Sequence, residues 1–274
     1  MSIFEIYIGQ LLGYQFFINA LIGVLLISAA AAMVGTYIVT RRLVAISGGI
    51  THACFGGLGL GCFLGVNPMI PASIFAVGSA LGVEWLSRRH NVREDSAIAV
   101  VWAVGMAIGV VFVFLTPGFV PELNSFLFGN ILTISTADLW VFAAYLVVLS
   151  GFFFWKYREI VACSFDPDFA RVSHLPVRFV NTVMTLLVAL CIVLTIRLVG
   201  IMLLMSMISL PQLTAEVFAR RFSVMMGLSV VVSVLSCVSG LLLATIIDVP
   251  CSALIVMVMG GIFAIAKIIG SFIR

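Results

Sequence analysis

The chain has 274 residues, of which 63% are hydrophobic and only 9% are charged. Soluble domains carry about 25% charged residues, so this composition excludes a soluble fold and requires lipid around most of the surface. The net charge of +3 is too small to indicate a nucleic-acid partner, and no basic patch is interleaved with aromatic residues.

Nine stretches are apolar and long enough to cross a bilayer, which takes about 20 residues in a helix. They lie at residues 16–39, 47–65, 69–87, 96–115, 137–155, 178–196, 200–218, 223–246 and 251–271. The weakest separation falls at Arg197 to Gly200, and without it the count is eight. No internal repeat divides the chain. We expect one domain over residues 1–274, an all-α integral membrane protein and a polytopic bundle of nine, alternatively eight, transmembrane helices.

The basic residues predict the orientation of this bundle. Of the 14 Lys and Arg residues, only Arg197 falls on the opposite side from the rest when nine spans are assumed. Cytoplasmic loops carry an excess of Lys and Arg, so the basic side is expected to face the cytoplasm. The N-terminus is then outside the cell and the C-terminus inside.

Motifs for ATP hydrolysis and for hydrolytic catalysis are missing. The chain has no GxxxxGK[ST] phosphate-binding loop, no HExxH and no nucleophile elbow. We expect a protein that is not an enzyme. If it moves a solute uphill, the energy comes from a partner subunit or from an ion gradient.

The second span carries small residues at a helical spacing. Ala53, Gly57, Gly61 and Gly65 recur every four residues and would form one smooth stripe on a helix. Such stripes let another helix backbone approach closely, so we interpret this one as a helix-packing surface.

His52 lies beside that stripe, within the span. An ionisable residue at membrane depth is costly, usually faces a cavity, and is a candidate for function. Neutral imidazole is also a common ligand of transition metals. His52 is therefore a candidate for the substrate path, while a histidine hydrogen-bonded to a neighbouring helix remains the alternative.

Glu216 lies near the inner end of the seventh span, after Pro211. Arg220 follows four residues later, and this spacing favours an ion pair on a helix surface. Pro211 removes a backbone hydrogen bond and can break the helix, which membrane proteins tolerate where the helix lines a cavity. Glu216 is thus either a partner of Arg220 or a second candidate for the path. For three methionines of the same span, adaptable packing is favoured over soft-metal ligation; these are Met202, Met205 and Met207.

The inner connection, at about residues 157–177, has the signals of a short helix. Asp166 is placed to cap it, Pro167 occupies the first turn, and Asp168 lies at the positive end of the helix dipole. Phe165, Phe169 and Val172 would share one face. This helix is expected either to dock into a groove of another protein or to lie on the lipid surface.

These features together resemble the permease subunits of the bacterial zinc, manganese and iron ABC importers, the ABC-3 family. The resemblance extends from about Phe17 to Ile268. Its matching stretches are Arg41 to Leu43, Ile46 to Ala53, Phe126 to Leu132, Phe165 to Arg171, Arg197 to Leu204, Leu210-Pro211 and Asp248 to Pro250.

The resemblance implies a multi-pass permease of the type II importer kind in the bacterial inner membrane. Two copies would pair as a homodimer with two cytoplasmic ATP-binding subunits, and the ion would cross between the two permeases. The segment containing Asp166, Asp168, Phe169 and Arg171 would be the coupling helix that docks on the ATPase. An extracytoplasmic metal-binding protein would deliver the ion to the outer face, near the Phe126–Asn130 loop.

The chain departs from the family pattern at Gly48. Many members have an acidic residue four positions before the histidine, and here only His52 of that pair is present. Either another residue supplies the carboxylate, with Glu216 as our candidate, or the ion meets a different ligand set.

Two functions follow as hypotheses. The first is the permease of an ATP-driven importer of divalent transition metal ions, zinc or manganese and then iron, with no permanently bound cofactor. The second is an ion-gradient-driven secondary carrier that acts without an ATPase.

Overall fold

The computed structural model describes residues 13–90, 93–117, 129, 131–247 and 249–273, and within them it contains helices and no strands. The elements are α2 (Gln15–Thr40), α3 (Val44–Leu64), α4 (Met69–His90), α5 (Glu94–Leu115), η1 (Ile131–Thr133), α7 (Thr136–Trp155), α8 (Tyr157–Phe165), α9 (Pro167–Val172), α10 (Val177–Phe218), α11 (Phe222–Ile247) and α12 (Cys251–Ile273). The expected all-α fold is confirmed. Most of the Phe126–Asn130 loop and Asp248 lie outside the described residues.

Eight helices of the described chain are long and apolar enough to cross a membrane, and α10 is the longest with 42 residues. A straight helix of that length would span about 63 Å, twice the hydrocarbon core of about 30 Å. The chain instead turns at Gly200, whose φ of 82° and ψ of 172° are not helical. Residues 177–199 and 201–218 are thus two membrane-length halves, so the eight helices hold the nine expected segments.

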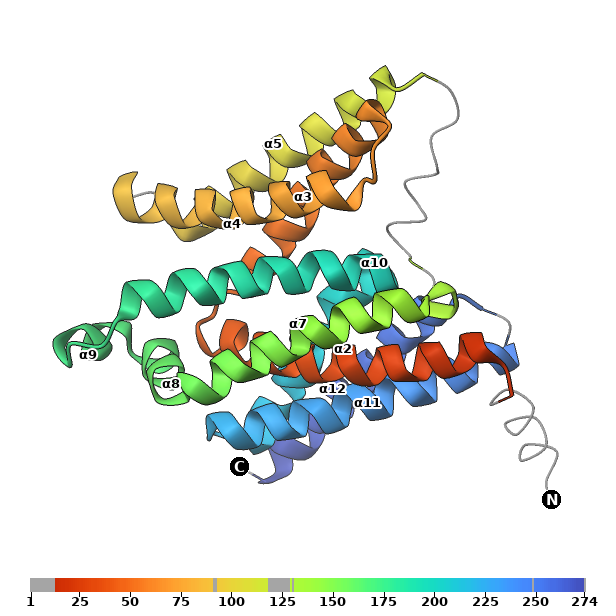
Figure 1. The fold of residues 1–274 in the computed structure, drawn as a ribbon. Helices are drawn as coiled ribbons and strands as arrows, with labels where there is room; N and C mark the ends of the chain where they lie inside the picture. Colours follow the sequence, from red (N-terminus) through yellow and green to blue (C-terminus); the bar gives the residue numbers. More distant parts are fainter. Residues whose placement is uncertain (1–12, 91–92, 118–128, 130, 248, 274) are drawn as a thin grey trace.

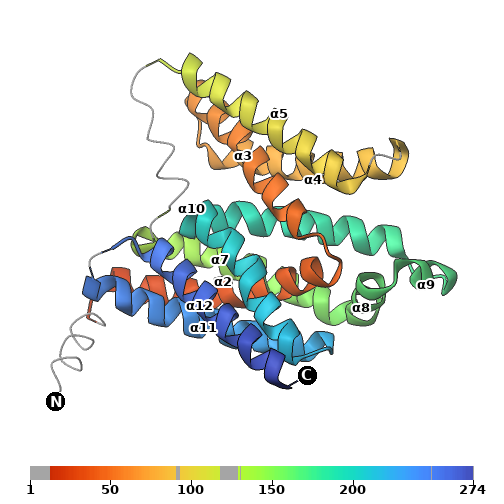
Figure 2. The ribbon, with the colours of Figure 1, turned by 180° about the vertical axis from the view of Figure 1, so that it is seen from behind.

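The helices form two groups on either side of α10 (Figures 1 and 2). α3, α4 and α5 pack chiefly on one another and reach the remaining helices through α10. α2, α7, α11 and α12 lie on the other side of the first half of α10, and the short helices α8 and α9 lie at one end of the bundle. α10 is therefore the central element of the fold.

The turn at Gly200 is held from outside α10. Gly129, with φ of 58°, lies against it so closely that a Cβ atom there would come within 2.4 Å of the Gly200 nitrogen. Nearby, Arg197 Nε contacts Asp138 Oδ1 at 2.7 Å and joins α10 to the start of α7. Arg197, the one basic residue expected away from the others, is therefore paired with a carboxylate.

A proline inside α10 leaves a backbone carbonyl without its helical donor, because Pro211 has no N–H to offer to Met207 O. The fully buried Gln212 replaces that donor, since its Nε2 lies 3.2 Å from Met207 O and 2.8 Å from Ala31 O of α2. Gly35 of α2 makes room for the amide, as a Cβ there would lie 2.5 Å from Gln212 Nε2. Pro211 thus keeps helical angles, and the chain breaks at Gly200 instead.

The small residues of α3 lie where its neighbours come closest. A Cβ added to Gly57 would lie 2.4 Å from Pro71 O, and one added to Gly61 would lie 2.6 Å from Pro68 Cα, at the start of α4. Gly65 was assigned to the same stripe, but nothing lies within 4 Å of its added Cβ. Gly65 is the left-handed C-cap of α3, with φ of 66°, so it ends the helix instead of packing.

Glycines with and without space for a methyl group should respond differently to substitution by alanine. Gly57→Ala should lower the free energy of unfolding by about 1–3 kcal/mol, because the added methyl overlaps backbone atoms of α4. Gly78→Ala, in α4 with open space around it, should instead raise it by about 0.5–1 kcal/mol through helix propensity. Denaturant unfolding in a fixed detergent measures both, and equal effects of the two substitutions would contradict the packing described.

Candidate functional site

His52 is half-buried on α3, and its imidazole lies flat against an indole of α5. The ring centroids of His52 and Trp102 are 4.4 Å apart and the ring planes differ by 2°. The indole is itself held, because Trp102 Nε1 donates to the Met106 thioether at 3.0 Å. The stack fixes the plane of the imidazole, and with it the direction of the ring nitrogen lone pair.

Close contact between α3 and α5 produces this stack. A Cβ on Gly105 would lie 2.6 Å from Ala53 Cα, and one on Gly109 would lie 2.5 Å from Phe55 O. The two helices therefore touch backbone to backbone, with residues 53–55 beside residues 105–109. One turn earlier on α5, this register places Trp102 beside His52.

Gly48, one turn before His52, faces the second half of α10. A Cβ at Gly48 would lie 3.0 Å from Met205 Cε. The methyl group of the Met205 side chain therefore occupies the direction in which a side chain at Gly48 would project. Met207 is buried in the core, while Met202 is exposed.

The second half of α10 presents a mixed polar face that continues from Met202. Its partly or fully exposed residues recur every three or four positions: Met202, Ser206, Ser209, Leu213 and Glu216. The hydroxyls of Ser206 and Ser209 donate to carbonyls of their own helix, those of Met202 and Met205, so their oxygen lone pairs point outward as acceptors. We call these five residues the α10 stripe.

The described part of one chain does not contain a complete metal site. No group of three or more His, Cys, Asp or Glu side chains converges within it. His52 has an aromatic and a thioether environment, and Glu216 lies at the far end of the α10 stripe. The structure does not bring these two candidates together within one chain.

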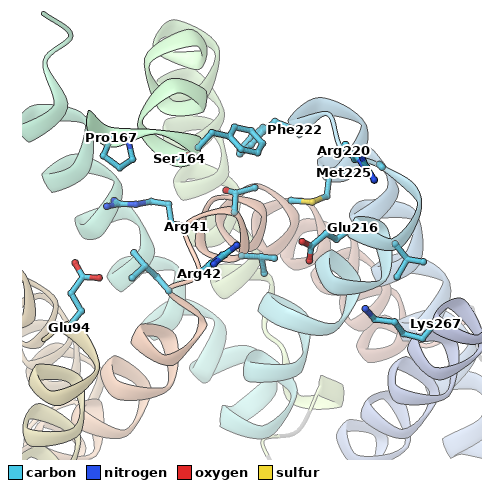
Figure 3. A pocket seen from close by; sticks show the side chains of 16 residues that line it. Arg41, Arg42, Glu94, Ser164, Pro167, Glu216, Arg220, Phe222, Met225 and Lys267 are labelled. Atoms are coloured by element: carbon cyan, nitrogen blue, oxygen red, sulfur yellow. The ribbon is translucent and has the colours of Figure 1, made fainter. Parts of the chain in front are cut away.

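Glu216 lines a cavity of about 800 Å³ at the end of the bundle where α8 and α9 lie (Figure 3). The expected pair with Arg220 is not formed, because α10 ends at Phe218 and Ala219 is extended, with φ of −130°. The spacing of four residues therefore does not lie on a helix. Four cations and two carboxylates line this cavity, which we call the basic-end pocket: Arg41, Arg42, Arg220, Lys267, Glu94 and Glu216.

Arg41 and Arg42 of this pocket differ in how they are held. Arg41 Nη1 donates to Tyr37 Oη at 2.7 Å and to Asn181 Oδ1 at 3.1 Å, so its guanidinium is fixed between α2 and α10. Arg42 ends α2 in a left-handed conformation, with φ of 58°, at the position where a helix end usually has glycine. Non-glycine residues adopt this conformation at a cost of about 1–2 kcal/mol.

The segment beside the pocket begins a helix as its sequence predicts. Asp166 caps α9, and its Oδ1 accepts from the backbone N–H groups of Asp168 and Phe169 at 3.1 and 2.9 Å. Arg171 Nη1 and Asp168 Oδ1 are 2.9 Å apart, but both side chains are largely exposed and their pairing adds little stability. α9 therefore depends mainly on its cap.

α8 and α9 leave large apolar side chains in the open. Phe165, Phe169 and Val172 are 57%, 62% and 80% exposed. In the same segment, a hydrogen bond from Lys156 lowers the pKa of Glu159 and keeps this pair charged near the membrane end of α8. Exposed apolar side chains next to a charged pair at the start of α8 are typical of a surface that binds another protein.

Two features of the site were missed by the sequence analysis. Trp102 carried no signal as a single residue, although the Gly105 and Gly109 spacing in α5 indicates close packing. The left-handed Arg42 was also missed, because a helix end with arginine in the glycine position has no sequence signature.

Comparisons with known proteins agree on one family. The family model described as the ABC 3 transport family matches residues 13–270. An uncharacterized membrane protein of Synechocystis sp. is 36% identical over 249 residues, which are 91% of this chain and 89% of that protein. The manganese transport system membrane protein MntC of Halalkalibacterium halodurans is 31% identical over 272 residues, which are 97% of this chain and 91% of that protein.

A solved structure has the same fold. PsaBC from Streptococcus pneumoniae in complex with Fab contains a chain that superposes with a TM-score of 0.84 at 25% identity. The alignment covers 96% of this chain and 94% of that one.

The cap of α9 can be tested by hydrogen–deuterium exchange. Asp166→Ala removes the acceptor of both capping hydrogen bonds, which should cost about 1 kcal/mol and raise the exchange rate of the α9 amides about fivefold. Asp168→Asn, which only disturbs an exposed pair, is the matched control and should leave these rates nearly unchanged. Equal rates in both variants would show that α9 is stabilised by something other than its cap.

Proposed function

The chain belongs to the ABC 3 transport family, and we propose that it is the membrane permease of an ATP-driven importer of divalent metal ions. One observation carries this proposal: the family match reaches into every membrane-length helix of the described structure. The name of the MntC relative, a manganese transport protein, makes manganese the first candidate for the transported ion. Zinc and iron are the competing candidates.

The proposed ion path runs between two copies of the chain. A metal ion needs several ligands, and the described part of one chain brings no three metal-binding side chains together. A two-fold pair would bring His52 and the α10 stripe of each copy to one shared surface. The incomplete site in one chain therefore supports a homodimer, with the ion bound between its halves.

His52 is the proposed ligand within the membrane, and the stack on Trp102 supports it in two ways. The indole holds the ring in one plane, so little orientational freedom is lost when an ion binds. A metal-bound imidazole carries positive charge, and the face of an indole attracts positive charge. The methyl group of Met205 packs at Gly48, one turn from His52, so a carboxylate for the ion has to come from elsewhere.

Glu216 is proposed to mark the inner end of the path. Its carboxylate is exposed at the last turn of α10 and makes no ion pair within the described residues. The cations that share its pocket disfavour firm binding of a divalent ion there. An ion that reaches Glu216 would therefore be released, as an exit requires.

The proposed orientation places the basic end in the cytoplasm, with the N-terminus outside and the C-terminus inside. α9 would then be the coupling helix that docks on the ATP-binding subunit through Phe169, with Asp166, Asp168 and Arg171 shaping it. The opposite end would receive the ion from an extracytoplasmic binding protein. The exposed apolar residues of α9 support this assignment.

Uptake of radioactive manganese separates a ligand role of His52 from a packing role. His52→Ala should reduce uptake to background, and His52→Phe should do the same, because phenylalanine keeps a ring against Trp102 but has no ring nitrogen. Protein levels are compared by blotting. If His52→Phe transports like the wild type, the histidine serves packing alone and is not in the path.

Docking through α9 is tested with Phe169→Asp. A charge in the apolar contact should abolish co-purification of the ATP-binding subunit and ATP-driven uptake, while membrane insertion stays normal. The control is Ser173→Asp, which places the same charge at an exposed residue just after α9. Uptake by the lone chain in liposomes, driven by a proton or sodium gradient, would instead support the secondary-carrier hypothesis.

A further inference from the structure

Three cations of the basic-end pocket have no anionic partner within the described part of the chain, although Lys267 Nζ lies 5.8 Å from the centre of the Phe263 ring. The side chains of Arg42, Arg220 and Lys267 make no hydrogen bond or ion pair with another described residue, and all three are exposed. Glu94 and Glu216 line the same cavity without pairing with them. Figure 3 shows the labelled side chains around the hollow, carried by different helices. The pocket thus keeps an excess of positive charge.

The position of Arg42 does not require a cation to end α2. Its left-handed φ of 58° would suit glycine, which would end α2 equally well. The neighbouring Arg41 is already fixed by Tyr37 and Asn181. The pocket therefore combines one immobilised cation with three that are free to meet an anionic group.

The location of the pocket indicates which anion can reach it. Its walls include the ends of membrane helices, together with Phe165 and Pro167 around the start of α9. The helix-end residues are Val39, Thr40, Arg41, Arg42, Leu43, Glu216, Val217, Ala219, Arg220, Phe222 and Lys267. Phe165, which is 57% exposed, lines this cavity, so a protein that covers the apolar side chains of α8 and α9 would also reach the cavity wall. A cytoplasmic partner is thus favoured over a lipid headgroup, because one protein could contact α9 and the cavity together.

We propose that the basic-end pocket receives a carboxylate-bearing segment of the ATP-binding subunit, which pairs with Arg42, Arg220 and Lys267. This inference rests on the proposed function, since it needs a subunit docked on α9. The docking surface then has two parts: an apolar contact through α9 and a charged contact in the pocket. The bound carboxylates would also offset the cations beside Glu216 and so ease the passage of a divalent cation at the proposed exit.

The test is rebinding of the ATP-binding subunit to the full-length permease in nanodiscs. The subunit is isolated from the native complex and identified by its phosphate-binding loop and its ATP hydrolysis. The variant Arg42→Gly/Arg220→Gln/Lys267→Gln should bind it about tenfold more weakly and with less dependence on salt concentration. Arg42→Gly relieves the left-handed strain, so this part of the variant should not unfold the permease.

A matched pair of neighbouring residues controls for overall charge. Arg220→Gln removes a cation that lines the pocket, and Arg221→Gln removes an equally exposed cation that does not. Only Arg220→Gln should weaken binding. Equal effects of the two substitutions, or unchanged binding by the triple variant, would overturn the proposal.

Two further outcomes separate this inference from its premise and from the lipid alternative. If Phe169→Asp abolishes binding and the triple variant does not, α9 docking stands and the pocket proposal fails. If the wild-type permease binds no ATP-binding subunit, the proposed function itself fails. If the triple variant differs from the wild type only in nanodiscs with anionic phospholipid, the pocket holds a headgroup and the proposal is overturned.

Discussion

The constraint on which this structure depends is that backbone polar groups at membrane depth must find partners within the protein, because lipid offers none. The arrangement around Pro211 shows how strictly the chain meets it. Proline removes the donor for Met207 O, and the amide of Gln212 supplies one while it also binds Ala31 O of α2. A defect in one helix thereby becomes the link between two helices, and Gly35 is small because that amide needs the space.

A second consequence is that close packing replaces the hydrophobic effect as the force between these helices, since lipid is as apolar as the side chains it would displace. Close packing requires small residues, and the nearest atom to a Cβ added at Gly57, Gly61, Gly105 or Gly129 is in each case a backbone atom of another segment. The α3–α5 contact then fixes side chains as well as helices. Because Ala53 and Gly105 touch, His52 and Trp102 lie on facing turns, where their rings stack.

The features predicted correctly from the sequence are those that depend on residues close together in the chain. Hydropathy located the spans, and the capping pattern at Asp166 located α9, because both depend only on residues near in sequence. Glu216 and Arg220 were placed on one helix because hydropathy does not show that the helix ends at Phe218. Gly65 is predicted to pack because the spacing of small residues does not show that α3 ends at Leu64. Trp102 and Gln212 act through residues more than 40 positions away, and one sequence holds no signal for such pairings.

α10 crosses the bundle twice, once before and once after Gly200, and so physically connects α9 with the proposed ion path. Four residues separate the end of α9 from the start of α10, which turns at Gly200 at the opposite end of the bundle and returns to Glu216 beside the basic-end pocket. On the way its second half carries Met205 against Gly48, one turn from His52. Displacement of α9 by a docked subunit would act on α10 at both of its ends, directly at Val177 and through the pocket at Glu216. Because Gly129 and the Arg197–Asp138 pair hold the turn at Gly200, a displacement of either end would be expected to move the two halves of α10 about that point, and with them Met205 against Gly48.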